Sequence, residues 1–384
     1  MKRTLITTVT LNAALDKTYV LPRFALHTAN RVGRMLVYPG GKGVNMARVV
    51  HQLGGDVLAA GFAAGWNGER LAAELDARGV KHRFVPACGE SRLALTIIDE
   101  EAEREASSGA GLARAVTELI EPGHRVTPQQ LEALLETVQE LARQSYIVAL
   151  CGSLPEGAPA DTYAALVEAA RAEGALVFVD SSGAALAASL GARPDLIKPN
   201  APEAAGLLGA PVPSDEASAV ALLRQLIGAD DRGGLPAAGP QTSCPDPSAS
   251  LSAGITATSD TARNAPKAGA DGALSGGEDK PCLRPALPYA VLTLGADGAL
   301  AASREDGLLR VRVPAVPARS AVGCGDAFFA GLALGFARGL PFPEALRLAA
   351  ATGTAVSLQL EAGAADPADV QRLLKLVAVE RLEG

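Results

Sequence analysis

Short apolar strands alternate with amphipathic helices along most of this chain, and this alternation restricts the fold more than any other feature. Residues 4–11, 57–63, 146–151 and 176–180 are β-branched or aliphatic runs typical of buried strands, and helical patterns lie between them. This order predicts a doubly wound α/β fold, in which helices flank a mostly parallel sheet. Such sheets bind ligands at the carboxyl ends of their strands.

Two regions depart from the alternation. Strand-like segments within roughly 12–40 and 90–120 have no helices to match, and they predict a small antiparallel sheet suited to a lid over a site. Residues 100–113 between them read as a loop. Residues 229–287 are rich in small and polar residues, which predicts a disordered or loosely folded surface insertion. A regulatory segment is the alternative.

Charge and cysteine content exclude several classes of protein. The 384 residues carry a formal net charge of −7, so nothing predicts binding to nucleic acid or to a membrane surface. Five cysteines without metal-ligand spacing favour reduced thiols in a cytoplasmic protein. The Thr-interrupted N-terminal run reads as a first strand rather than a signal peptide.

The glycine-rich string at 321–331 is the strongest local sign of chemistry. Gly323 and Gly325 flank Cys324, Asp326 follows, and an apolar helical run begins there. Uncovered N–H groups and the positive end of a helix dipole would form an anion site. Asp326 could then accept a proton from a hydroxyl that attacks the bound anion. The alternative is an ordinary turn in which Asp326 caps the helix.

A second glycine-rich turn opens the helix expected at 44–53. Gly40, Gly41 and Asn45 suit a polyhydroxylated ligand, and Lys42 suits its phosphate. The P-loop pattern is absent, and a plain strand-to-helix turn is the alternative. Asp16, after the first strand, could accept hydrogen bonds from sugar hydroxyls.

Other strand ends carry weaker signals. Asn200 and Glu203 open a helix, where they would either hold the water shell of a magnesium ion or form a capping box. Ser153 offers a hydroxyl at the expected ligand edge. The string from Thr293 to Gly298 could pass beneath a nucleotide base.

Taken in order, these strings resemble the ribokinase-like sugar kinases, the pfkB family. The resemblance covers nearly the whole chain except 229–287, as a single kinase domain over 1–384. It is closest to the hexose-phosphate branch, which includes 1-phosphofructokinases and tagatose-6-phosphate kinases. The matching motifs are the entry at Asp16, Gly40-Gly41-Lys42-Gly43-x-Asn45, Cys151-Gly152-Ser153-Leu154-Pro155, Val179-Asp180-Ser181-Ser182-Gly183, Lys198-Pro199-Asn200-x-x-Glu203, Thr293-Leu294-Gly295-x-x-Gly298 and the Asp326 turn.

The resemblance implies a ribokinase-like core with a β-sheet lid, often a dimer interface, and ATP with Mg²⁺ as cofactors. It implies phosphorylation of a hexose phosphate, with fructose 1-phosphate to fructose 1,6-bisphosphate as the first expectation. Tagatose 6-phosphate and fructose 6-phosphate are the alternative acceptors. Asp326 would be the base, and Gly323, Cys324 and Gly325 the anion hole.

The resemblance also assigns two sets of binding residues. The first would hold the sugar through Asp16, Gly40, Gly41 and Asn45, and its phosphate through Lys42, Arg92 and Arg31, with Ser153 nearby. The second would hold the nucleotide through Lys198, Asn200, Thr293, Gly295 and Gly298, with Glu203 organising Mg²⁺.

Several positions depart from the family pattern. Ala13 follows Asn12 where proline is usual, and Cys324 replaces alanine, which suggests sensitivity to oxidation. Ala94 and Ile120 stand where asparagines are usual, which removes polar contacts near the sugar. These losses favour a second hypothesis, a sugar-phosphate-binding protein with little catalysis. A nucleoside or unphosphorylated-sugar kinase is disfavoured by Lys42 and Arg92.

Overall fold

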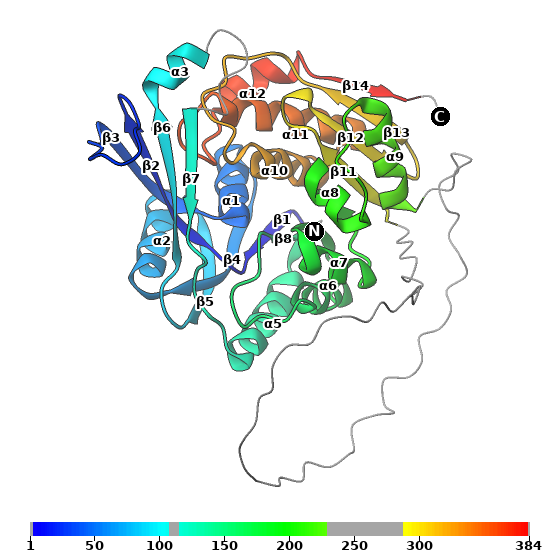
Figure 1. Cartoon of the computed structure of the whole chain (residues 1–384). Helices are drawn as coiled ribbons and strands as arrows, with labels where there is room; N and C mark the ends of the chain where they lie inside the picture. Colours follow the sequence, from blue (N-terminus) through cyan, green and yellow to red (C-terminus); the bar gives the residue numbers. More distant parts are fainter. Residues whose placement is uncertain (1–2, 107–114, 229–286, 383–384) are drawn as a thin grey trace, which may run out of the picture.

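The chain folds into a large sheet flanked by helices and a small sheet that stands to one side of it (Figure 1). The computed structural model describes residues 3–106, 115–228 and 287–382. The insertion expected at 229–287 lies outside the described residues, apart from Leu287, which is buried against the core.

The larger sheet has ten strands within the described ranges, in the order β14-β13-β12-β11-β10-β9-β8-β1-β4-β5. All neighbouring pairs from β11 to β5 are parallel, and the three strands beyond β11 pair antiparallel. The doubly wound, mostly parallel sheet predicted from the sequence is confirmed. Its strands are β1 (Leu5–Thr10), β4 (Val57–Ala64), β5 (Lys81–Ala87), β8 (Ser145–Cys151), β9 (Leu176–Asp180), β10 (Leu196–Ile197), β11 (Tyr289–Thr293), β12 (Ala299–Ser303), β13 (Gly307–Arg312) and β14 (Ala378–Arg381).

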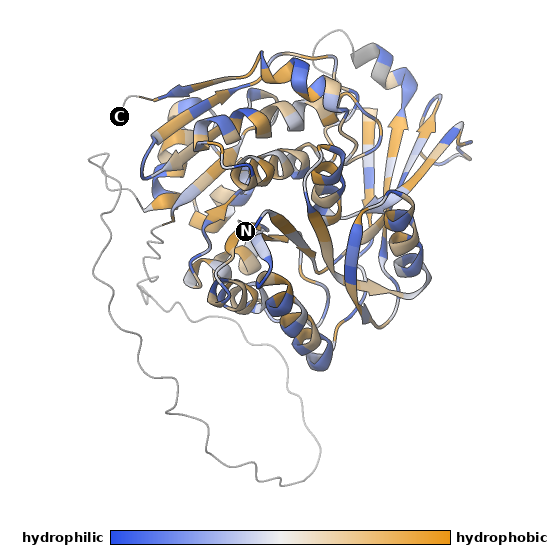
Figure 2. Cartoon of the chain, turned by 180° about the vertical axis from the view of Figure 1, so that it is seen from behind, coloured by the Kyte–Doolittle hydropathy of each residue, from blue (hydrophilic) through white to orange (hydrophobic). Residues whose placement is uncertain are grey.

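Helices cover both faces of this sheet because its central strands bury alternate side chains on opposite sides. In β8, Ile147 and Ala149 belong to one apolar cluster and Val148 and Leu150 to the other. Figure 2 shows apolar residues along the strands and on the inner sides of the helices. One face carries α1 (Lys42–Gln52), α2 (Gly65–Ala77), α10 (Cys324–Ala337), α11 (Phe342–Ser357) and α12 (Pro367–Leu374); the other carries α5 (Pro128–Ala142), α6 (Thr162–Ala172), α7 (Gly183–Gly191), α8 (Ala201–Leu208) and α9 (Glu216–Ile227).

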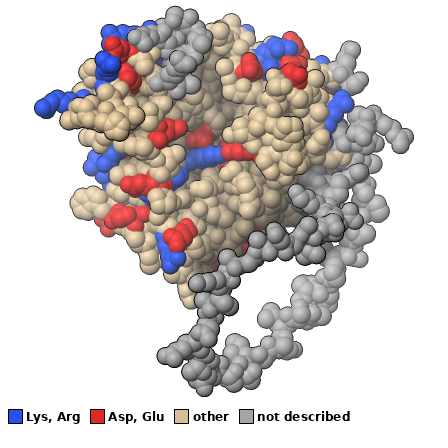
Figure 3. Space-filling view, viewed as in Figure 1, with Lys and Arg blue, Asp and Glu red and all other residues tan. Residues whose placement is uncertain are grey.

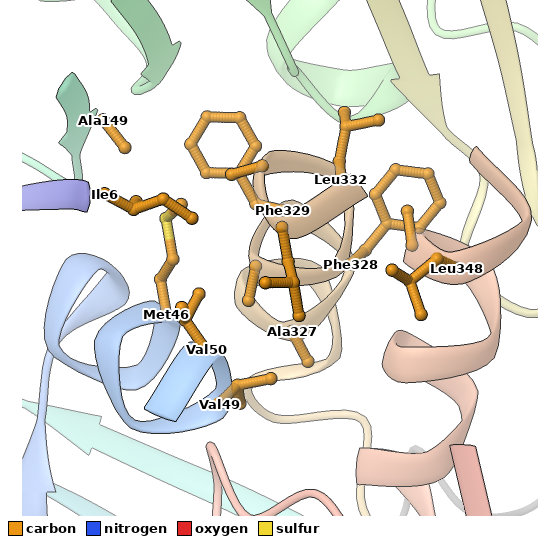
Figure 4. Close-up of a cluster of buried hydrophobic side chains, with 14 of the residues drawn as sticks. Ile6, Met46, Val49, Val50, Ala149, Ala327, Phe328, Phe329, Leu332 and Leu348 are labelled. Carbon is orange, nitrogen blue, oxygen red and sulfur yellow. The ribbon is translucent and has the colours of Figure 1, made fainter. Parts of the chain in front are cut away.

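Helix α10 lies between α1 and α11, and this packing sets the position of its first turn. Met46 and Val50 of α1 point toward Ala327 and Phe329 of α10, while Phe328 lies beside α11 (Figure 4). Burial of each large apolar side chain contributes about 1.5–3 kcal/mol. Rotation or sliding of α10 would therefore be costly, and its N-terminus is held against α1.

The small sheet has the order β3-β2-β6-β7, and its strands are β2 (Ala14–Leu21), β3 (Arg34–Gly40), β6 (Arg92–Asp99) and β7 (Val116–Ile120). The separate sheet expected from 12–40 and 90–120 is confirmed, but its antiparallel character holds only for the outer pairs. The central pair β2–β6 is parallel. The reason is that β2 and β6 continue from β1 and β5, which run in the same direction.

The sequence reading differs from the structure at several other elements. Residues 100–113 were expected to be a loop, but α3 (Glu100–Ala106) is a helix, and the remainder of that segment lies outside the described residues. The reading also missed β5, β13, β14 and α12. No helix in the described part of the chain is long and apolar enough to cross a membrane.

Candidate active site

The turn before α10 places Asp326 where core packing holds it. Gly323 is the helix N-cap, with φ 79°, a conformation that glycine adopts without strain. Asp326 lies in the first helical turn, where N–H groups have no helical acceptor. The turn therefore presents backbone donors and a carboxylate side by side.

Asp326 is held as a hydrogen-bond acceptor. Its Oδ2 accepts a hydrogen bond of 2.9 Å from Nδ2 of Asn45 on α1, and no side chain caps α10. The alternative in which Asp326 caps its own helix is therefore wrong. Burial and the nearby Asp180 raise the pKa of Asp326 to about 6, against the opposing effect of Lys42. At neutral pH the group is mostly deprotonated and its pKa lies near the range suited to a general base.

Asp180, the last residue of β9, joins two lysines. Its Oδ1 lies 2.9 Å from Nζ of Lys42, and its Oδ2 lies 2.9 Å from Nζ of Lys198. Burial alone would raise the pKa of Asp180, but Lys198 and Lys42 outweigh it and hold this pKa below its ordinary value. The Lys198 ammonium also lies 3.7 Å from where a Cβ on Gly325 would stand. Positive charge thus gathers beside the N-terminus of α10.

The sequence alone assigns no role to Asp180, although Asp180 belongs to one of the motifs that match the family. The available signal was an acid at the carboxyl end of a buried parallel strand, on the edge where such sheets bind ligands. The reading placed Lys42 with the sugar's phosphate. In the structure Lys42 contacts Asp180 and lies 3.7 Å from Oε1 of Glu203. Burial lowers the pKa of Lys42, but these two carboxylates outweigh it and the net shift is upward, so Lys42 remains a cation.

Asn200 and Glu203 form a capping box at the start of α8. The Asn200 side chain accepts from the Glu203 N–H at 2.8 Å, and Glu203 Oε2 accepts from the Asn200 N–H at 2.9 Å. The capping alternative is thus confirmed, while Oε1 of Glu203 faces Lys42. Thr293, at the end of β11, bridges Asn200 through the backbone. Gly295 begins a short 3₁₀ turn beyond it.

Gly298 closes that turn under a steric constraint. A Cβ at Gly298 would lie 2.2 Å from the carbonyl oxygen of Val311 in β13. The loop from 294 to 298 therefore lies against the sheet edge beside Asn200. The five residues expected to face the nucleotide line one continuous stretch at the ends of β10 and β11.

Asp16 lies on the other side of Asp326, at the base of β2. It is 9 % exposed, and its Oδ1 has no hydrogen-bond partner among the described residues. Burial raises the pKa of Asp16 to about 7, although Arg48 and Arg92 oppose the shift. A buried acceptor without a partner costs free energy, which a ligand hydroxyl would recover.

Gly40 pairs with Ala14, two residues before Asp16 on β2, and its lack of a side chain leaves space for the Asp16 carboxylate. A Cβ at Gly40 would lie 2.0 Å from the Asp16 carboxyl carbon, far inside any real contact. Under the expected sugar-kinase activity, Gly40→Ala should displace Asp16 and lower kcat/KM for the sugar acceptor about 10²-fold or more. Steady-state kinetics with varied acceptor and fixed ATP would measure the change.

The matched control for this prediction is Gly206→Ala in α8. No atom lies within 4 Å of a Cβ built at Gly206, so alanine there should fit and favour the helix by about 0.5–1 kcal/mol. Equal losses of kcat/KM in the two variants would show that Gly40 has no special relation to Asp16.

Asn12, Arg92 and Ser153 surround the same side of the site. Nδ2 of Asn12 donates to the Pro122 carbonyl at 3.0 Å and lies 3.4 Å from Oγ of Ser153. Nε of Arg92 donates to the Asn12 carbonyl at 3.2 Å. Arg31 is not brought into this group. It lies in the exposed segment between β2 and β3, with no hydrogen bond or ion pair to another described residue.

Ala94 and Ile120, which replace the asparagines usual in the family, lie in one cross-strand row of the small sheet. Asp16 pairs with Ala94, and Ala94 pairs with Ile120. Residues paired directly across strands place their side chains on the same face. The face that carries Asp16 therefore continues as aliphatic groups, and Ile120 is 60 % exposed.

Cys324 is protonated at neutral pH. Burial and Asp326 raise the pKa of its thiol to about 12, and its Sγ lies 3.6 Å from the Ser320 carbonyl. Because the thiolate is the reactive form, this environment argues against the expected sensitivity to oxidation.

No cluster of three or more His, Cys, Asp or Glu residues could hold a metal ion within the described ranges. Mg²⁺ commonly takes one or two carboxylates and fills its shell with water and phosphate oxygens. Oε1 of Glu203, which the cap leaves unused, fits that pattern. The donor set thus suits Mg²⁺ bound together with a nucleotide. Charged side chains of both signs gather across the middle of this face of the molecule (Figure 3).

Comparison with known proteins agrees with this architecture. The model of the pfkB family carbohydrate kinases matches residues 9–231 and 286–369. A 1-phosphofructokinase of Rhodobacter capsulatus is 32% identical over 378 residues, which cover 98% of each chain. The chain is thus a phosphotransferase of the sugar-kinase class. It belongs to the pfkB family of carbohydrate kinases.

Solved structures share the fold. Phosphofructokinase-2 from Escherichia coli in complex with fructose-6-phosphate superimposes with a TM-score of 0.73 at 24% identity, over 98% of this chain and 99% of that one. Ribokinase from Arabidopsis thaliana, complexed with ribose and ATP, gives a TM-score of 0.64 at 18% identity, with the same coverage.

Proposed function

We propose that this kinase transfers the γ-phosphoryl group of ATP to a hydroxyl of a hexose phosphate. Fructose 1-phosphate, converted to fructose 1,6-bisphosphate, is the first candidate acceptor. The 1-phosphofructokinase relative supports this choice, and the phosphofructokinase-2 relatives make fructose 6-phosphate the second. Tagatose 6-phosphate is the third.

The placement of Asp326 carries the proposal. This carboxylate is fixed by Asn45 at 2.9 Å, has a pKa raised to about 6, and lies at a helix N-terminus beside the Lys198 ammonium. Phosphoryl transfer to an alcohol requires a base next to a positively charged site that binds the phosphate anion.

In the proposed reaction the acceptor hydroxyl oxygen bonds to the γ-phosphorus as the bond to the β-phosphate oxygen breaks. Asp326 takes the hydroxyl proton, and ADP leaves. The backbone N–H groups of Gly325 and its neighbours, with Lys198 and Lys42, stabilise the charge on the transferred group. Mg²⁺, when bound with ATP, neutralises phosphate charge, and Glu203 is the residue placed to orient its waters.

Acceptor recognition divides between Asp16 and the cations around it. Asp16 offers an unpartnered oxygen to the sugar hydroxyls, and Arg92 provides a half-buried guanidinium for the existing phosphate. Lys42 contacts Asp180 and lies 3.7 Å from Glu203, so its charge would act on the phosphates of the nucleotide. Arg31 would contact the acceptor phosphate only if the segment between β2 and β3 moved toward Arg92.

A coupled assay of ADP release tests the proposal with fructose 1-phosphate, fructose 6-phosphate, tagatose 6-phosphate and fructose. We expect kcat/KM for a phosphorylated sugar to exceed that for fructose about 10²-fold or more, because the unphosphorylated sugar leaves the half-buried Arg92 guanidinium without a phosphate partner. Preference for fructose would contradict the proposed phosphate site.

A sugar-phosphate-binding protein with little catalysis is the second candidate, because the aliphatic row at Ala94 and Ile120 removes polar contacts beside Asp16. Calorimetry that detects sugar-phosphate binding without any turnover of ATP would select it.

We further propose that the small sheet is a lid and that its outer face pairs with a second copy. Lys17, Tyr19, Leu93, Leu95 and Leu119 line a hollow of about 330 Å³ on that face. A tetrameric inhibited form is described for the Escherichia coli phosphofructokinase-2. Sedimentation of the wild type and of Leu119→Glu would test this pairing.

A further inference from the structure

Arg48 is a buried charged residue that has no role in the phosphoryl transfer proposed above. It is 1% exposed and is the largest of the fully buried side chains in the described part of the chain. A buried guanidinium is costly unless its donors are satisfied, so a residue of this kind needs a specific partner set.

That partner set comes from two segments, the end of β3 and the stretch at 361–362. Nη1 of Arg48 donates to the carbonyl of Pro39, at the end of β3, at 3.0 Å, and to the carbonyl of Ala362 at 2.8 Å. Nη2 forms an ion pair with Glu361. The ring of Tyr38 lies 5.3 Å from the guanidinium carbon. These contacts hold both Nη atoms, while the buried Nε has no hydrogen-bond partner among the described residues.

The same Nη1 reaches the side chain of Asn45, one helical turn earlier. It lies 3.4 Å from Oδ1 of Asn45, whose Nδ2 donates to Asp326 Oδ2 at 2.9 Å. An amide has an acceptor end and a donor end. With its acceptor end turned to Arg48, Asn45 can only present its donor end to Asp326.

The loop that holds Arg48 also limits where Asn45 can go. A Cβ at Gly363 would lie 3.0 Å from Oδ1 of Asn45, so the loop closes over the amide. A reversed amide would place one carbonyl oxygen against the Asp326 carboxylate, and the repulsion would displace the base.

We propose that Arg48 is a positioning residue that fixes the Asn45 amide and, through it, the carboxylate of Asp326. This inference rests on the proposed function, because it gives Asp326 the role of base. Arg48 touches neither substrate, so its effect belongs to kcat and not to the KM for ATP.

A double-mutant cycle tests the proposal. We expect Arg48→Met to lower kcat on the order of 10²-fold, as a misplaced catalytic group does. Asn45→Ala should lower kcat by a similar factor. The double variant should have a kcat only slightly below that of Asn45→Ala, because both substitutions disturb the same positioning of Asp326 through Asn45. A fall in kcat of the double variant equal to the product of the two single-variant falls would overturn the proposal.

Arg310 of β13 provides the matched control. It is 5 % exposed, lies 2.8 Å from Glu216 and donates to the carbonyls of Ala299 and Val311, next to the Gly298 turn but with no hydrogen bond to Asn45 or Asp326 among the described residues. Arg310→Met should destabilise the fold to a similar degree and leave kcat within about threefold. An equal fall of kcat in both variants would show that Arg48 is only structural.

A readout without turnover separates this proposal from the proposed function. The side-chain amide of Asn45, identified by its loss in Asn45→Ala, should shift in the NMR spectrum of Arg48→Met and not in that of Arg310→Met. An unmoved signal overturns the proposal even if kcat falls. Absence of turnover in the wild type would overturn the proposed function, while the NMR signal still decides the role of Arg48.

Arg48→Lys carries the same tests if Arg48→Met does not fold. Lysine keeps the charge but has one ammonium in place of a planar fork, so it cannot span the same acceptors. We expect about a tenfold fall in kcat and the same shift of the Asn45 signal. A Lys variant with wild-type kcat and an unmoved signal would count against the proposal.

Discussion

Replacement of Asp326 by asparagine should lower kcat about 10²–10⁴-fold while the sugar phosphate still binds. Asparagine matches the size of aspartate but cannot take the proton of the attacking hydroxyl. The proposed anion site would remain, because its proposed donors are backbone groups and Lys198. Turnover measured by ADP release and acceptor affinity measured by calorimetry would separate the two effects.

The pH dependence supplies a second readout for Asp326. The base must be deprotonated, and its pKa is raised to about 6, so wild-type kcat should fall as pH drops through about 6. Asp16 has a pKa raised to about 7 and is the residue proposed to bind the acceptor, so kcat/KM should begin to fall at a higher pH than kcat. The residual rate of Asp326→Asn should lack the fall near pH 6.

Asp215→Asn is a suitable control, because Asp215 caps α9 at the surface, away from the site. Its substitution should leave kcat and its pH profile unchanged. An Asp326→Asn enzyme with wild-type kcat would rule out Asp326 as the base.

Local patterns were sufficient to predict the turn at Gly323 and the alternation of the core. Apolar alternation identifies a buried strand, and glycine before an apolar helical run identifies a helix start, without knowledge of any distant residue. For that reason Asp326 could be singled out from the sequence. The same local information could not decide whether Asp326 caps its helix, because that depends on Asn45, 281 positions away.

The elements α3 and β13 were not predicted from the sequence because neither shows a regular apolar pattern of its own. The helix α3 is almost entirely Glu, Ala and Arg, so no apolar stripe marks it, although these residues are strong helix formers. The strand β13 buries the charged Arg310, which disguises its alternation. The direction of the β2–β6 pair was also inaccessible, because side-chain alternation is the same in parallel and antiparallel strands.

Contacts between distant residues explain the remaining gap in the predicted site. Lys42 and Asp180 are 138 positions apart, and the pairing of Lys42 with a buried acid is visible only in the fold. The family resemblance assigned roles to Lys42 and Lys198 but none to Asp180. It therefore did not indicate which residue holds the two lysines when no phosphate is bound.

Substitution of Asp180 by asparagine should destabilise the protein by about 3–5 kcal/mol, because it leaves buried positive charge without its carboxylate. Asp180 is 1% exposed and Lys198 is 4% exposed, so water cannot replace the lost partner. Chemical denaturation without nucleotide would measure the loss. We expect MgATP to restore more stability to Asp180→Asn than to the wild type, since the triphosphate supplies negative charge next to both lysines.

Asp195→Asn distinguishes this effect from the general cost of removing a partly buried acid. Asp195 precedes β10 and accepts a hydrogen bond of 2.8 Å from the Val177 N–H, and no lysine contacts it among the described residues. Its variant should lose stability and gain no more from MgATP than the wild type does. If Asp180→Asn were as stable as the wild type, or if MgATP restored both variants equally, the two lysines would not depend on Asp180 and the proposed phosphate site would lose its anchor.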